Sequence, residues 1–153
     1  MPPLPKPTAL VLVHTDSIAS YAWSVGRDRA DELSDLWLRE INDHLRENVG
    51  PVILVRQGWD DESRVQDFLA RLPKDRRIVT MMFDESTSDW APFLSDLSAK
   101  LLSLGVKSAI VGGIWYDPDE KTGCATRTAV YLRSKLPTKV DRDLVGCESD
   151  IEE

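Results

Sequence analysis

The chain has 153 residues, of which 42% are hydrophobic and 29% are charged, so it can form one globular domain with a substantial core. Its formal net charge of −7 argues against a nucleic-acid partner, and no apolar run approaches the roughly 18 to 20 residues that cross a membrane. Two cysteines are too few for a disulfide framework and favour a reduced, cytoplasmic setting.

Short apolar runs alternate with amphipathic stretches along the chain. Strands are expected at 8–13, 52–55, 77–83, 108–113 and, from a weaker pattern, 138–145; helices are expected at about 28–48, 63–72, 93–104 and 122–135. Gly105 is placed to close the third helix in a left-handed conformation. A proline-rich lead-in (1–7) and an acidic tail (148–153) flank the single domain at 8–147.

This alternation predicts a three-layer α/β/α domain with five or six mostly parallel strands and right-handed crossovers. The first strand is uniformly apolar, as expected for a strand buried on both faces. We therefore predict a Rossmann-like strand order of 3-2-1-4-5, with the first strand inside the sheet.

Aromatic and ionisable side chains are most concentrated after the strand at 108–113. The next loop contains Trp115, Tyr116 and Lys121, and a helix then begins at 122–124. Open α/β sheets bind ligands at the carboxyl ends of their strands, so this loop is the predicted site. Trp59, which follows the second strand, belongs to the same edge. The three aromatics are suited to stacking on a planar ring or, alternatively, to pinning loops by packing.

Cys124 is expected in the first turn of its helix, where unpaired backbone N–H groups and the helix dipole favour a thiolate. The N–H groups of Gly123 and Cys124 are candidates for an oxyanion hole. The alternative is that Cys124 is a small buried hydrophobe beneath the loop. Cys147, near the chain end, has no comparable position and is interpreted as structural or exposed.

His14 and Asp16 follow the first strand and lie two residues apart, so they point to one side while the strand lasts. If the first and fourth strands are neighbours, His14 can deprotonate Cys124 and Asp16 can orient the imidazole. The alternative is a hydrogen-bonded histidine that caps the strand end.

Other patterns in the sequence give weaker evidence for a binding site. The loop at 117–119 contains two aspartates, but the spacing of an EF-hand fails and a turn fits better. His14 and His44 lack a paired ligand spacing, so we expect no metal and no cofactor. Arg127, with the helix start at 122–123, is suited to seating a phosphate, although no glycine-rich nucleotide motif accompanies it.

Three runs, at 105–113 (GVKSAIVGG), 123–129 (GCATRTA) and 140–144 (VDRDL), resemble the isochorismatase and nicotinamidase-type cysteine hydrolases. The resemblance implies a six-stranded α/β/α sheet with Cys124 as the nucleophile. Two positions depart from the family pattern. His14 stands where the family has an aspartate, with Asp16 two residues later, and residues 84–85 (Asp-Glu) stand where it has a lysine. Lys121 offers a substitute amine from the long loop.

We therefore predict a small cysteine hydrolase that acts on a C–N or acyl bond of a small planar molecule. Cys124 is the expected nucleophile and His14 or Asp16 the base. The substrate is expected to contact the side chains of Trp59, Trp115, Tyr116, Lys121 and Arg127. The alternative is a divergent, non-catalytic domain that binds a small ligand or a protein partner through the loop at 114–123. A homo-oligomer is compatible with either function.

Overall fold

Strands and helices alternate throughout the described part of the chain, as the sequence pattern predicts. The computed structural model describes residues 4–13, 27–47, 50–57, 63–75, 77–83, 90–114 and 123–146. The elements are β1 (Thr8–Val13), α2 (Arg27–Glu47), β2 (Val52–Gln57), α3 (Ser63–Arg71), β3 (Ile78–Phe83), α4 (Ala91–Ser103), β4 (Ser108–Ile114), α5 (Cys124–Arg133) and β5 (Thr138–Gly146).

The described strands form a five-stranded sheet in the order β3-β2-β1-β4-β5, and every neighbouring pair is parallel. The predicted order is therefore confirmed. β1 is the central strand, and all six of its residues are buried, as expected for that position. At one edge, β3 mixes buried and exposed positions, in keeping with its less uniformly apolar sequence. The sixth strand implied by the family resemblance is not among the described residues.

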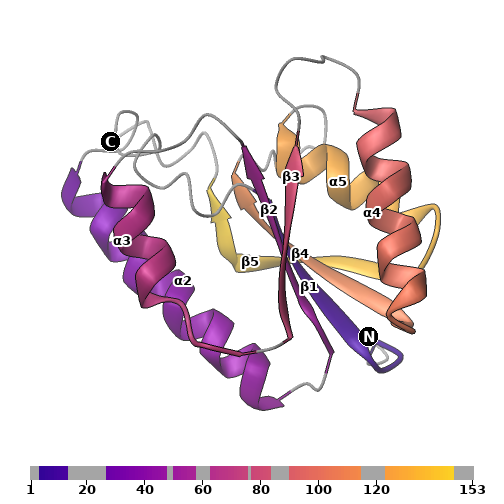
Figure 1. The fold of residues 1–153 in the computed structure, drawn as a ribbon, viewed down its shortest axis with the longest axis horizontal. Helices are drawn as coiled ribbons and strands as arrows, with labels where there is room; N and C mark the ends of the chain where they lie inside the picture. The colour runs from indigo at the N-terminus through magenta and orange to yellow at the C-terminus, as the bar shows by residue number, and fades with distance from the viewer. Residues whose placement is uncertain are drawn as a thin grey trace.

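Helices cover both faces of the sheet, which confirms the three-layer architecture. α2 and α3 lie on one side and α4 and α5 on the other (Figure 1). Alternate residues of β1 divide between the two cores, because successive side chains of a strand point to opposite faces. Ala9 and Val11 join the α4/α5 core, whereas Leu10 and Leu12 join the α2/α3 core. In the described ranges, no helix combines the length and apolarity needed to cross a membrane.

An irregularity interrupts β5, which explains its weak sequence pattern. Its pairing with β4 shifts between two points: β4 advances by two residues, from Val111 to Gly113, while β5 advances by five, from Val140 to Val145. Such a bulge breaks the two-residue alternation that identifies a strand in sequence. The irregular stretch includes Asp141, whose side chain contacts His44 of α2.

The end of the proline-rich lead-in is tied to the start of β4. The Lys107 N–H donates to the Pro7 carbonyl at 2.8 Å, and the Ser108 hydroxyl donates to the Pro5 carbonyl at 2.6 Å. The hydroxyl oxygens of Ser108 and Thr8 lie 2.8 Å apart in the interior. Residues 5–8 are thus attached to the domain by specific hydrogen bonds.

Candidate functional site

The carboxyl ends of β1 and β4 form the topological switch point of the sheet. After β1 the chain continues to α2 on one face of the sheet, and after β4 it continues to α5 on the other face (Figure 1). Ligands of open α/β sheets bind in the crevice outside such a point. Val13, the last residue of β1, is the register partner of Gly113. The first and fourth strands are therefore neighbours, as the predicted site requires.

Gly113 shows how closely the two strands approach at this edge. Its φ is +118°, and a Cβ built on it would lie 2.0 Å from the carbonyl oxygen of Val13. A side chain is therefore excluded both by the backbone conformation and by the neighbouring strand.

Cys124 occupies the predicted position, as the first residue of α5. The N-cap is Gly123, with φ 102° and ψ 151°, so no side chain at that position can accept a hydrogen bond from the first-turn N–H groups. The regular ladder begins where the Arg127 N–H donates to the Gly123 carbonyl at 2.9 Å. Cys124 is half-buried and packs against the α4/α5 core. This position is compatible with a nucleophile and equally with a small packing residue.

Arg127 lies one turn further along α5 and covers an aromatic cluster at the same edge of the sheet. Its guanidinium carbon is 5.7 Å from the Trp90 ring centroid. Trp90 stacks on Phe83, with centroids 4.2 Å apart, and meets Phe93 edge to face at 5.9 Å. This cluster was not predicted from the sequence. The sequence feature that could have indicated this cluster is Trp90, which stands immediately before a helix start that contains a proline.

The remaining predicted site residues lie outside the described residues. Their roles as base, positioning amine or stacking surface stay predictions. They are His14, Asp16, Trp59, Trp115, Tyr116 and Lys121.

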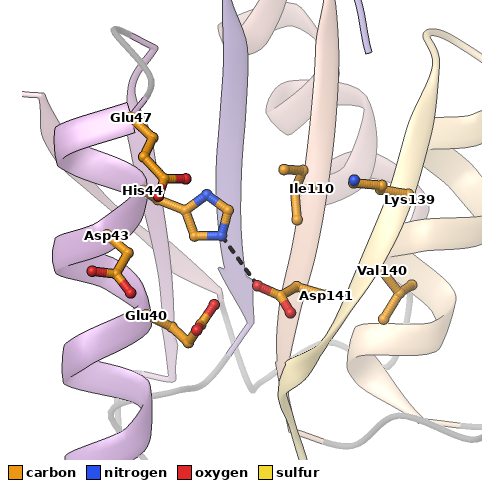
Figure 2. Close-up of a pocket in the computed structure, with 8 residues that line it drawn as sticks. All are labelled: Glu40, Asp43, His44, Glu47, Ile110, Lys139, Val140 and Asp141. Atoms are coloured by element: carbon orange, nitrogen blue, oxygen red, sulfur yellow. Dashed lines mark hydrogen bonds and ion pairs between the residues drawn. The ribbon is translucent and has the colours of Figure 1, made fainter. Parts of the chain in front are cut away.

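A second polar site lies between α2 and β5. The His44 Nε2 is 3.1 Å from the Asp141 Oδ2, and the two side chains are only 16% and 15% exposed. Glu40 is four residues before His44, so both project from the same face of α2. One potential ligand atom from each of the three residues lies within 4.8 Å of the other two. Figure 2 shows Glu40 and His44 extending from α2 towards the strand that carries Asp141.

This second site opens into a hollow of about 300 Å³. Besides the three residues above, the hollow is lined by Asp43, Glu47, Ile110, Lys139 and Val140. Ile110 belongs to the α2/α3 core, whereas Cys124 packs against the α4/α5 core. The hollow and the thiol therefore lie on opposite faces of the sheet.

The spacing between histidines gave no sign of this grouping in the sequence. The four-residue spacing of Glu40 and His44 was a usable signal, since it puts both on one helix face. Asp141 was not recognisable, because it is 97 residues away from His44 and meets it only through the tertiary fold.

Comparison with known proteins supports the fold alone. No protein-family profile and no curated protein matches the chain. Among solved structures, the nicotinamidase SaPncA from Staphylococcus aureus is similar, with a TM-score of 0.59 and 14% identity over 91% of this chain and 84% of that one. The MAR1 ribonuclease from Caenorhabditis elegans is also similar, with a TM-score of 0.58 and 16% identity over 98% and 71%.

These neighbours support the relationship that the sequence resemblance indicated, at the level of fold. The chain has the α/β fold of these two proteins, a nicotinamidase and a ribonuclease. At 14% and 16% identity, a shared fold does not transfer an activity, because one fold carries many chemistries.

Proposed function

We propose that the protein is a cysteine-dependent hydrolase acting on a C–N or acyl bond of a small planar molecule. The observation that carries the proposal is the position of Cys124. It is the first residue of α5, after the loop that leaves β4, in a fold similar to that of a nicotinamidase. β4 in turn pairs with β1 at the switch point, where ligands of such sheets bind.

The reaction begins when His14 removes the proton from the Cys124 thiol. His14 follows Val13 in the chain, and Val13 pairs with Gly113 of β4. The thiolate attacks the substrate carbonyl carbon, and the electron pair moves to the oxygen, where the N–H groups of Gly123 and Cys124 stabilise it. The intermediate collapses, the leaving amine takes the proton, and water then hydrolyses the acyl-enzyme. Asp16 orients the imidazole or itself serves as the base.

Substrate recognition is assigned to the aromatic and cationic side chains of this edge. Trp59, Trp115 and Tyr116 provide planar surfaces for a ring. Lys121 and Arg127 provide positive charge for an anionic group on the substrate, and Arg127 is exposed beside Trp90.

The competing function is a non-catalytic domain that binds a small ligand or a protein partner through the loop at 114–123. The observation that favours it is the sequence itself. His14 stands where the family has an aspartate, and Asp84 and Glu85 stand where it has a lysine. The net charge of −7 argues against RNA as the ligand, although one structural neighbour is a ribonuclease.

The test is release of ammonia from planar amides, beginning with nicotinamide, by the purified full chain. The proposal expects turnover that falls at least about a thousandfold in Cys124→Ala and in His14→Ala/Asp16→Ala. A Cys147→Ala variant is the matched control and should keep its activity. Absence of turnover on every amide and ester tried, with the thiol unreactive, would favour the binding domain instead.

A further inference from the structure

We propose that Glu40, His44 and Asp141 bind a divalent transition-metal ion between α2 and β5. This site is separate from the predicted thiol chemistry, since it lies on the other face of the sheet. The three side chains come from two elements, helix α2 and strand β5, so the tertiary fold brings them together (Figure 2).

The three potential ligand atoms lie close enough together to reach one ion after side-chain rotation. Zinc binds imidazole nitrogen and carboxylate oxygen at about 2.0 to 2.2 Å, so ligand atoms around one ion lie roughly 3.3 to 3.5 Å apart. Here His44 and Asp141 are 3.1 Å apart, and all three ligand atoms lie within 4.8 Å of one another. Small side-chain rotations would complete the coordination. The ion would replace the direct contact between the imidazole and the Asp141 carboxylate.

The surrounding charge favours a cation. The hollow is lined by four carboxylates, those of Glu40, Asp43, Glu47 and Asp141, and by the Lys139 amine. Arg46 is paired with Asp43, so the carboxylates of Glu40, Glu47 and Asp141 are the ones that favour a cation. The Asp141 side chain is only 15% exposed, so solvent screens its charge less than it screens the charge of Glu47, which is exposed.

The ligand types of Glu40, His44 and Asp141 favour one class of metal ion. An imidazole with two carboxylates suits zinc and related first-row divalent ions, whereas magnesium and calcium prefer oxygen ligands alone. Three protein ligands leave one position of a tetrahedral ion open. The adjoining hollow of about 300 Å³ has room for a water molecule or small ligand there.

The competing interpretation is that the His44–Asp141 pair only fastens α2 to β5. In that case the pair would need no third residue, the chain would show no saturable ion binding, and Glu40 would have no part in holding an ion. The two interpretations therefore differ in what they expect of Glu40.

Titration calorimetry of the metal-free full chain with zinc chloride tests the proposal. We expect one saturable ion per chain, with an affinity that falls at least about tenfold in Glu40→Gln, His44→Gln and Asp141→Asn. Glu47→Gln is the matched control. It removes one carboxylate of the same helix and hollow but no ligand, so its affinity should stay within about threefold of wild type. Cys124→Ala should also retain the site.

Cobalt(II) provides a second readout in the same proteins. The wild type should show visible bands of a nitrogen- and oxygen-ligated ion without a thiolate charge-transfer band, and Glu40→Gln should lose them while its circular dichroism is unchanged. The proposal is overturned by no saturable zinc binding to the wild type. It is also overturned by unchanged affinity in Glu40→Gln, by loss in Cys124→Ala, by equal losses in Glu47→Gln, or by equal binding of magnesium.

Discussion

Gly113 of β4 lies directly beside Val13 of β1, and a Cβ on Gly113 would stand only 2.0 Å from the Val13 carbonyl oxygen. The two strands meet at the carboxyl edge of the sheet, where the chain leaves for the predicted loop and for Cys124. Close backbone packing at this pair therefore supports the frame of the candidate active site.

Replacing Gly113 with alanine should destabilise the fold by at least about 3 kcal/mol, because it combines an unfavourable positive φ with a clash against backbone atoms. Urea unfolding followed by circular dichroism measures the difference. The matched control is Gly105→Ala. Gly105 also has a positive φ, of 74°, but nothing lies within 4 Å of the position that its Cβ would take, so a loss of about 1 kcal/mol is expected. Equal losses in both variants would show that the contact with Val13 is unimportant.

The Cys124 thiol should react with iodoacetamide at lower pH than an ordinary thiol. The start of α5 favours the thiolate, so the alkylation rate should reach half its maximum below the pH of about 8.5 typical of free cysteine. Mass spectrometry of the modified peptide, across a pH series, measures this rate. The Cys124→Ser variant reports Cys147 alone and serves as the reference. If the alkylation rates of Cys124 and Cys147 depend on pH in the same way, that result counts against catalysis by Cys124.

The double variant Trp115→Ala/Tyr116→Ala tests the loop after β4. If these aromatics form a lid over a ligand, the variant should weaken binding of small planar molecules and leave the molecular mass in solution unchanged. If they form an interface, it should dissociate an oligomer instead, as light scattering would show. A change in thermal stability alone would mean that they are packing residues and that this loop is not a site.

Asp75 should make the stability of the fold depend on pH in acid. Hydrogen bonds from the Arg77 side chain and backbone lower the Asp75 pKa from 3.8 to about 2. Between these values the unfolded chain binds more protons, so the stabilisation is complete above about pH 4 and is lost as the pH falls towards 2. Asp75→Asn should lower stability at neutral pH and flatten the acid part of the profile, measured by thermal unfolding. An unchanged slope between pH 4 and pH 2 would contradict this role.

Arg77 extends the same contact to α2, since its guanidinium also donates to the Leu45 carbonyl at 2.7 Å. Arg77→Lys is therefore a useful companion variant. A lysine keeps the charge but not the forked geometry, so it should retain only part of the stability that Arg77 provides.

Local features of the sequence determined most of the fold. The alternation of apolar and amphipathic runs predicted the strand–helix order, because each element must bury one face or one stripe. The uniformly apolar β1 identified the centre of the sheet. Glycine at 105 predicted a helix end with positive φ, and the run before Cys124 predicted a helix start close to that residue. Each of these predictions depends on residues within a few positions of one another in the chain, so a short stretch of sequence is enough to make it.

The tertiary structure alone decided the contacts between distant residues. The bulge in β5 arises from pairing with β4, and no local pattern marks it. His44 and Asp141 are 97 residues apart, and Arg127 meets Trp90 only because α4 and α5 share one face of the sheet. Such contacts depend on how complete elements pack. For that reason the sequence indicated where Cys124 begins its helix, while the Glu40–His44–Asp141 grouping became visible only once α2 and β5 lay together.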